Sequence, residues 1–192
     1  MNILRSALAI ALAASTLTAN ANEEQSSSPV FGLHFGIGFG GYTFAETSNN
    51  EEVEAGGGLL FGAFTQIPLA QGSAQPVFAK LGMSYMRDSV DAEDGDASFT
   101  KFPIDALVMT QVNSVKFGAG LTYHLNPTYK EDSPYLSGEV EFDNAVGLLI
   151  EADYSFANSN AEFGLRYTKI DYEIDGFEID GNAFALTIGS TF

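Results

Sequence analysis

The chain contains no cysteine and no tryptophan, and only eight of its 192 residues are lysine or arginine. The lack of cysteine excludes disulfides, thiol chemistry and cysteine-bound metals. The scarcity of basic residues argues against a nucleic-acid interface, which needs a positively charged surface to neutralise phosphates. With 25 acidic residues, the formal net charge is −17.

Long apolar runs are also missing. The apolar stretch from Ala7 to Ala14 is well short of the ~20 residues that a membrane-spanning helix needs. It follows Arg5 and precedes the small-x-small sequence Ala19-Asn20-Ala21. This order predicts a secretory signal peptide over residues 1–21, and the rest of the chain suits a single domain.

The dominant pattern in the chain is alternation of apolar with small or polar residues. Phe31, Leu33, Phe35, Ile37 and Phe39 alternate with four glycines and a histidine. A period of two indicates a strand with one apolar face. Eight such segments are predicted, at about residues 30–44, 57–67, 76–87, 99–111, 115–125, 145–156, 161–172 and 183–192. Pro103 lies inside the fourth segment and is expected to disrupt its pairing, because proline has no N–H to donate.

The connections between these segments alternate in character. Three are short or carry little charge, at residues 68–75, 112–114 and 157–160. Four are acidic and hold 19 of the 25 acidic residues, at residues 45–54, 88–98, 126–143 and 171–181. Short turns at one end and longer loops at the other are typical of membrane β-barrels.

The last predicted strand ends on an aromatic residue. Its apolar face holds Phe184, Leu186, Ile188 and Phe192, and this strand resembles the C-terminal strand of Gram-negative outer-membrane barrels. The chain as a whole resembles the eight-stranded bacterial outer-membrane β-barrel proteins, such as the OmpA membrane domain and OmpX. In those proteins the terminal strand is the signal read by the outer-membrane assembly machinery, a role that the resemblance assigns to these four residues.

The resemblance implies an all-β fold, an eight-stranded antiparallel up-and-down transmembrane barrel over residues 30–192. A periplasmic tail, residues 22–29, would precede it, both termini would be periplasmic, and the acidic loops would face outward from the cell. A soluble β-sandwich is the competing fold, but its solvent-facing positions should carry many charges. Here those positions carry mainly Gly, Ala, Ser and Thr, which favours the barrel.

Charged residues inside the strands mostly share the parity opposite to the apolar face. They are Lys80, Lys101, Asp105, Lys116, Glu151, Asp153, Glu162 and Arg166. An eight-stranded barrel has an interior that side chains can fill, so these four bases and four acids are predicted to form a neutral ion-pair network that plugs the lumen. The alternative is a conducting pore lined by the same residues.

Interfacial tyrosines are expected at the membrane boundaries, where amphipathic rings are favoured. The predicted aromatic belt consists of Tyr85, Tyr123, Tyr154 and Tyr167.

Catalytic and metal motifs are not matched. In His124-Leu125-Asn126, an asparagine stands where lipid A deacylases of this size carry serine, and His34 lies too deep in a strand to match a lipid A palmitoyltransferase. The acidic stretch Asp91–Asp96 lacks the spacing of an EF-hand loop. We therefore predict no catalytic residue, metal site or cofactor, and no enzyme.

Three functions follow as hypotheses. The first is a structural or surface-interaction barrel, the second a small solute or ion channel, and the third a lipid A-modifying enzyme. The expected partners are outer-membrane lipids and lipopolysaccharide, the assembly machinery, and divalent cations at the acidic loops. The barrel is expected to be a monomer and to bind no nucleic acid.

Overall fold

The structure is a computed structural model that describes residues 28–46, 51–70, 76–92, 95–133, 137–157 and 159–192. The predicted signal peptide and most of the predicted tail lie outside the described residues. Within the described ranges, no helix is long and apolar enough to cross a membrane. The described strands are β1 (Val30–Phe39), β2 (Thr43–Glu46), β3 (Glu52–Glu54), β4 (Gly58–Ala70), β5 (Val77–Ala92), β6 (Gly95–Val112), β7 (Val115–Asp132), β8 (Ser137–Glu141), β9 (Ala145–Ser155), β10 (Ala161–Lys169), β11 (Asp171–Ile174), β12 (Phe177–Asp180) and β13 (Ala183–Thr191).

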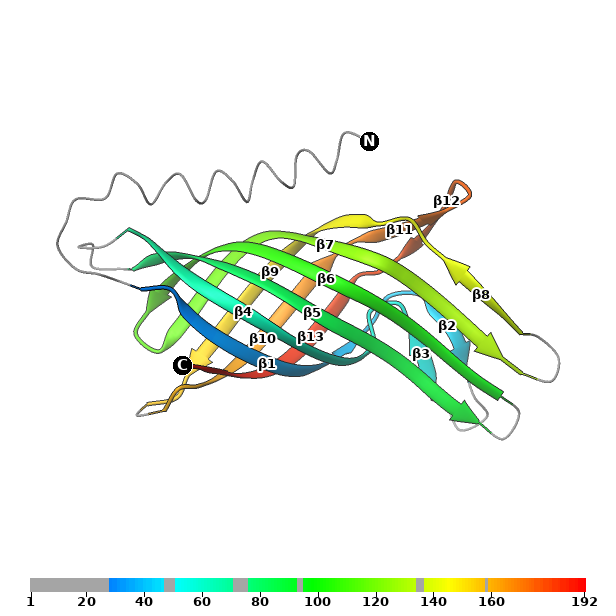
Figure 1. Ribbon diagram of the computed structural model, residues 1–192, viewed down its shortest axis with the longest axis horizontal. Coiled ribbons are helices and arrows are strands. Elements are labelled where there is room, and N and C mark those ends of the chain that lie inside the picture. The colour runs from blue at the N-terminus through cyan, green and yellow to red at the C-terminus, as the bar shows by residue number, and fades with distance from the viewer. Residues whose placement is uncertain (1–27, 47–50, 71–75, 93–94, 134–136, 158) are drawn as a thin grey trace.

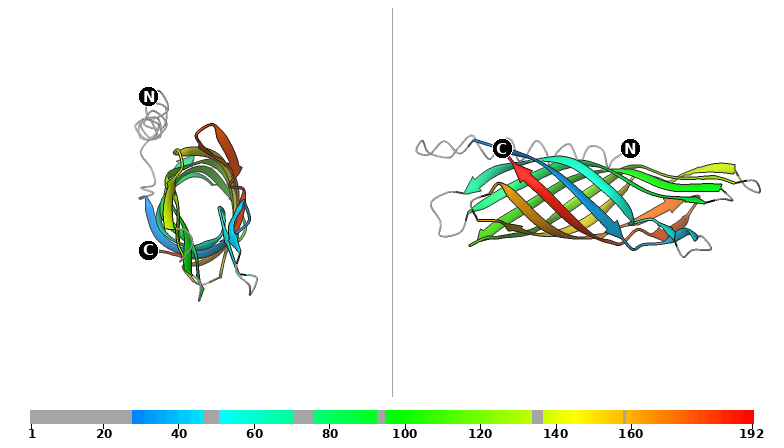
Figure 2. Two further views of the ribbon diagram at one scale, coloured as in Figure 1. Left: turned by 90° about the vertical axis from the view of Figure 1, so that its right-hand side faces the viewer. Right: turned by 90° about the horizontal axis from the view of Figure 1, so that it is seen from below.

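Eight of these strands form a closed antiparallel ring (Figures 1 and 2). Their order is β6-β5-β4-β1-β13-β10-β9-β7, and pairing of β7 with β6 closes the ring. Closure satisfies the backbone groups of both edges, so the wall has no free edge. The predicted fold, an eight-stranded up-and-down barrel, is confirmed.

The two faces of the wall differ sharply. In the β1–β13 pair, Phe35 lies opposite Ile188 and Ile37 opposite Leu186, and all four side chains point outward. About half of each outward side chain is exposed, for example 55% of Ile188. Inward neighbours such as Gly36 and Thr187 are buried. A continuous apolar outer band is the mark of a barrel whose surroundings are lipid.

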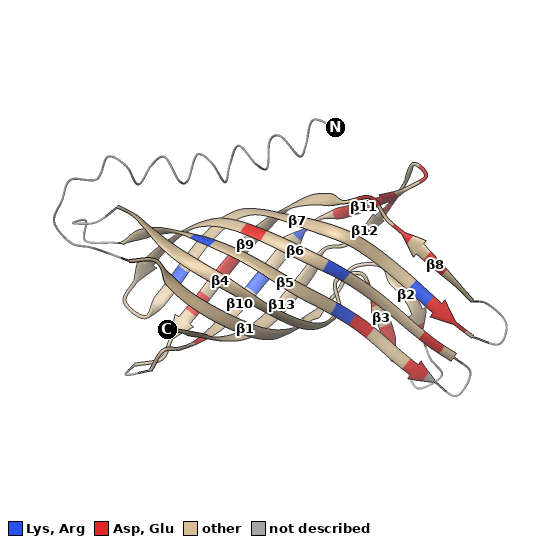
Figure 3. Cartoon of the chain, viewed as in Figure 1, with Lys and Arg blue, Asp and Glu red and all other residues tan. Residues whose placement is uncertain are grey.

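The two ends of the barrel also differ. At one end, called here the turn end, lie the C-terminus and the short connections at residues 113–114 and at residues 156–157 and 159–160 (Figure 1). At the other, called here the acidic end, lie β8 and the hairpins β2–β3 and β11–β12, and Figure 3 shows acidic residues concentrated there. The tight turn of β11–β12 uses Asp175 and Gly176, both with positive φ, as a primed hairpin turn requires.

Most of the described residues in the four acidic segments lie in strands and not in loops, which corrects the prediction for those residues. β5, β6 and β7 run through them to lengths of 16, 18 and 18 residues, and β8 adds a further strand to β7. Charge did not end these strands, because the acidic side chains alternate with buried apolar ones. Val90, Phe99 and Tyr172 are each at most 8% exposed and point inward.

Pro103 disrupts pairing as predicted. The β5–β6 register has no partners for Phe102 and Pro103, although it resumes unchanged on both sides. The β6–β7 register shifts by one residue between Thr100 and Phe102. The irregularity separates the part of β6 and β7 that belongs to the closed ring from the part that extends beyond the ring at the acidic end, which is called here the protruding sheet.

Candidate functional site

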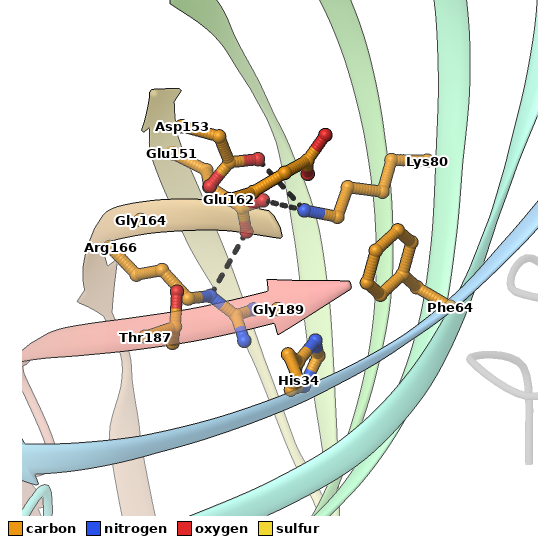
Figure 4. Close-up of a pocket in the computed structure, with 10 residues that line it drawn as sticks. All are labelled: His34, Phe64, Lys80, Glu151, Asp153, Glu162, Gly164, Arg166, Thr187 and Gly189. Atoms are coloured by element: carbon orange, nitrogen blue, oxygen red, sulfur yellow. Dashed lines mark hydrogen bonds and ion pairs between the residues drawn. The ribbon is translucent and has the colours of Figure 1, made fainter. Parts of the chain in front are cut away.

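The lumen holds several buried ion pairs, shown in part in Figure 4. Lys80 Nζ on β5 contacts Glu151 and lies 2.9 Å from Asp153 Oδ2, both on β9. Arg166 on β10 contacts Glu151 as well, with Nε 3.1 Å from Oε2. Two cations from different strands therefore share one carboxylate.

Arg166 extends this centre, because it also donates to Asp105 on β6, whose other oxygen accepts a hydrogen bond of 2.6 Å from the Thr122 hydroxyl. Lys116 on β7 forms a further pair with Glu162 on β10, and Glu162 lines the same cavity as Lys80 and Glu151. These pairs together are called here the ion-pair network. All of these charged side chains belong to residues at most 8% exposed.

Local sequence explains why these groups meet. Glu151 and Asp153 are two residues apart on β9, so both point into the lumen. Antiparallel pairing then sets Arg166 directly opposite Glu151, and Lys116 directly opposite Asp153. Gly164 lies opposite Asp153, and a side chain there would collide with the Asp153 carboxylate.

The structure does not bring Lys101 into this network, which corrects the prediction. Its Nζ donates to the Ala55 carbonyl and lies 5.5 Å and 5.7 Å from the ring centres of Phe99 and Tyr172. The residue is 1% exposed. The network itself therefore contains three bases and four acids, and carries one excess negative charge when every group is ionised.

Lys101 lies in an apolar cluster that fills the barrel at the acidic end. Its buried members are Val53, Ala55, Val90, Ala97, Phe99, Phe142, Ile170 and Tyr172. Phe44 on β2 stacks on Phe99 and on Tyr129, each with ring centres 4.8 Å apart. We call these residues the aromatic cap, because they stand between the ion-pair network and the acidic end.

The β2–β3 hairpin is anchored to neighbouring strands by polar contacts of Glu54. Glu54 N donates to Asp88 Oδ2 at 2.8 Å, and the Glu54 carboxylate accepts from Gly40 N at 2.7 Å. Burial raises the pKa of the Asp88 carboxyl above its ordinary value. With the Lys101–Ala55 contact, these bonds fix the end of β3 across the barrel mouth.

Both histidines have buried partners. His34 Nε2 lies 2.9 Å from Ser84 Oγ, and Gly62 leaves room for both side chains. His124 Nδ1 lies 2.6 Å from the Tyr172 hydroxyl, not from a serine and a glutamate as the deacylase hypothesis would need. Burial raises the pKa of the Tyr172 phenol.

The free space in the network is very small. The cavity bounded by His34, Lys80, Glu151, Arg166 and their neighbours has a volume of about 10 Å³, which is the smallest space that holds one water. His34, which lines this cavity, therefore has no room beside it for an acyl chain or a sugar. Sequence reasoning missed this pair, because the register that joins β1, β4 and β5 is not visible in the sequence.

The aromatic cap was also missed, although a signal for it exists. Phe44, Phe99, Phe142 and Tyr172 are aromatic residues within or beside segments rich in acidic residues. Their alternation with the charges, as in Asp171-Tyr172-Glu173, indicates a strand rather than a loop.

The residues predicted for the aromatic belt lie on the outward face. Tyr85 and Tyr154 are 39% and 46% exposed, whereas Tyr123 and Tyr167 are partly covered. Tyr85 contacts Phe102 and Tyr167 contacts Phe184. The four residues predicted as the assembly signal also point outward, and Phe192 is 76% exposed.

No group of three or more histidine, aspartate and glutamate side chains is placed to hold a metal ion in the part of the chain that the structure describes. Residues 93 and 94 of the second acidic segment lie outside that part.

The closed ring, its apolar exterior and its filled interior agree with comparison to known proteins. Residues 7–192 match the outer membrane protein beta-barrel domain. The chain belongs to this family. Its place is therefore the bacterial outer membrane, and its apolar outer band faces lipid. A comparison with curated proteins finds no match.

One solved structure with a TM-score above 0.5 has the same fold at low identity. The attachment invasion locus protein Ail of Yersinia pestis is 11% identical, with a TM-score of 0.52, covering 85% of this chain and 97% of Ail. A structure of Ail with the heparin analogue sucrose octasulfate gives the same identity and coverage and a TM-score of 0.49. Neisserial surface protein A is 11% identical, with a TM-score of 0.47, covering 88% of this chain and all of that one.

Proposed function

We propose that this protein is a sealed outer-membrane barrel with a structural or surface-interaction role, not a channel. Its acidic end is extracellular and both termini are periplasmic. Residues 1–21 are removed on export, and the assembly machinery reads the strand that ends at Phe192. The chain acts without a cofactor and not as an enzyme.

The observation that carries the proposal is that two separate groups of side chains block the lumen. The ion-pair network fills the middle of the barrel, and the aromatic cap fills the acidic end. A conducting path would have to break buried ion pairs and also displace packed aromatic rings. Breaking one buried pair typically costs 3–5 kcal/mol, so such a path is rarely open.

The outward surface of the acidic end supports the surface role. On the β11–β12 hairpin, Asp171 lies opposite Asp180 and Glu173 lies opposite Glu178. Like charges directly opposite one another destabilise a hairpin. A strand pair built only for stability would not carry two such pairs, whereas a surface that meets cations or cationic partners gains from them.

Conductance in planar lipid bilayers tests the seal. We expect no steady conductance from the purified, folded protein, while a porin in the same bilayer conducts. A variant with both Phe44→Ala and Lys80→Ala weakens both seals and should show conductance steps. Steady, reproducible conductance from the unaltered protein would overturn the proposal in favour of a small channel.

The absence of cysteine allows a clean test of orientation. Glu178→Cys at the acidic end should react with a membrane-impermeant maleimide on intact cells. The matched control Ser159→Cys, in an exposed turn at the other end, should react only after the outer membrane is opened. The reverse labelling pattern would refute the orientation. Mass spectrometry of lipid A from cells with and without the protein tests the enzyme alternative, and we expect identical spectra.

A further inference from the structure

A hollow on the outward face of the protruding sheet has the chemistry of a ligand site. We propose that it binds a phosphoethanolamine group, a phosphate and an amine joined by a short spacer, presented by lipids of the outer leaflet. The inference rests on the orientation given in the proposed function, because it places this face outside the cell.

The hollow lies on β5, β6, β7 and β8 beyond the barrel wall. Register sets the outward side chains of this part of the sheet in three rows, given in the order β5, β6, β7, β8: Arg87, Thr100, Thr128 and Glu141; Ser89, Ser98, Lys130 and Glu139; Asp91, Asp96, Asp132 and Ser137. The hollow is lined by one residue of the first row, Arg87, by three of the second and by all four of the third. The hollow has a volume of about 470 Å³, within the range of small-molecule sites.

The position of the hollow is set by the aromatic residues below it. Tyr85 and Phe102, with ring centres 5.2 Å apart, are outward-facing and exposed. Arg87 follows Tyr85 by two residues on the same face, about 7 Å further along the strand. The lower edge of the hollow therefore starts where lipid headgroups begin.

The charges in the hollow are separated along its length. Arg87, at the membrane side, has no ion-pair partner among the described residues. Lys130 is already paired with Glu139 at 2.8 Å. Asp91, Asp96 and Asp132 lie side by side in the row furthest from the membrane. A ligand that fits carries its negative group toward the membrane and its positive group away from it.

A largely buried serine lies in the hollow between these charges. Ser98 lines the hollow and is only 9% exposed. Its row lies about 7 Å from the aspartate row, because successive outward residues are about 7 Å apart along a strand. Ser98 and Arg87 can thus contact a phosphate while its ethylamine reaches Asp96.

The distribution of basic residues also supports phosphate binding in this hollow. Seven lysines and arginines follow residue 21, and four of them are buried inside the barrel. The other three, Arg87, Lys130 and Lys169, are exposed, and two of them line this one hollow. Arginine suits phosphate in particular, because its planar fork can donate two parallel hydrogen bonds.

The first experiment uses soluble probes on the full-length mature protein in detergent micelles. Calorimetry compares O-phosphoethanolamine, inorganic phosphate and ethanolamine. We expect O-phosphoethanolamine to bind at least about tenfold more tightly than either fragment, since each charged hydrogen bond contributes enough for roughly a tenfold change. Equal binding of phosphate and O-phosphoethanolamine would overturn the proposal.

Three variants assign the roles. Arg87→Gln should weaken both phosphate probes about tenfold. Asp96→Asn should weaken O-phosphoethanolamine and leave inorganic phosphate unchanged or tighter. Lys169→Gln, which alters the exposed base outside the hollow, is the matched control and should change nothing. Equal losses in Arg87→Gln and Lys169→Gln would show a general charge effect and refute the site. A heat-dependent gel shift confirms that each variant is folded.

Vesicles then separate the two lipid sources of this group. Protein binding is compared between vesicles of phosphatidylglycerol with phosphatidylethanolamine and vesicles of phosphatidylglycerol with lipopolysaccharide that bears phosphoethanolamine. If the protein binds one type of vesicle and Arg87→Gln abolishes that binding, the result supports the site and identifies the lipid that supplies the phosphoethanolamine. If the protein binds neither type of vesicle, the proposal is overturned. Because the micelle experiment does not depend on orientation, a failure there leaves the cysteine labelling result, and so the proposed function, intact.

Discussion

Glu151 and Asp153 are neighbours on one strand, yet their removal should have very different effects. Glu151 contacts both Lys80 and Arg166, whereas Asp153 shares only Lys80, at 2.9 Å. Glu151→Gln removes the negative charge that two buried cations share. Asp153→Asn removes one charge from a network that has four acids and three bases. We therefore expect the first variant to be much less stable than the second.

The magnitude follows from burial. Both residues are 3% exposed, so solvent cannot replace the lost partner. Removing one member of a buried ion pair costs about 3–5 kcal/mol, and we expect Glu151→Gln to lose about that much. Asp153→Asn should lower the free energy of unfolding by less than about 1 kcal/mol, because Lys80 still forms its ion pair with Glu151. A difference of about 3 kcal/mol corresponds to a more than hundredfold change in the unfolding equilibrium constant.

Urea unfolding of the protein in lipid vesicles measures this difference. The signal is tyrosine fluorescence with circular dichroism, because the chain has no tryptophan. Glu141→Gln, an exposed residue on β8 that lies opposite Thr128, is the control and should leave the midpoint unchanged. If Asp153→Asn lost as much stability as Glu151→Gln, the assignment of the excess charge would be wrong.

Three further predictions concern the cap, the terminus and pH. Phe44→Ala should lower the free energy of unfolding by about 1–3 kcal/mol, less than the 3–5 typical of fully buried phenylalanine. Planar bilayers that contain this variant should still show no conductance, because the ion-pair network remains. Conductance from this single variant would mean that the ion-pair network does not close the lumen. Deletion of Phe192 should reduce the amount of protein in outer-membrane fractions of cells, and normal amounts would argue against its role in assembly. Burial and the hydrogen bond to Glu131 raise the pKa of Tyr129 to about 12. Since this pKa lies above the ordinary value near 10, its contribution to stability is complete below pH 10 and is lost as the pH rises toward 12. Phenolate absorbance compared between the unaltered protein and Tyr129→Phe should show this late titration, and ionisation near pH 10 would contradict it.

The wall of the barrel could be predicted from the sequence almost completely. A period of two is a local property, so strands such as Val30–Phe39 and Ala183–Thr191 are visible without any partner. The same parity separates the outward Ile188 from the inward Thr187. The acidic ends of the strands are harder to predict, because charge is typical of a loop although Val90 and Phe99 continue the alternation.

Parity by itself determined which residues point into the barrel, because each side chain's direction depends only on its own strand. Which of them meet was decided by the tertiary structure. Lys101 has the same inward parity as Lys80, but it lies at a different height and meets the aromatic cap instead of a carboxylate. Height in the lumen depends on the stagger between strands and on closure of β6 with β7, which are properties of the whole ring. The excess charge of the network, the cap and the outward hollow all follow from that stagger.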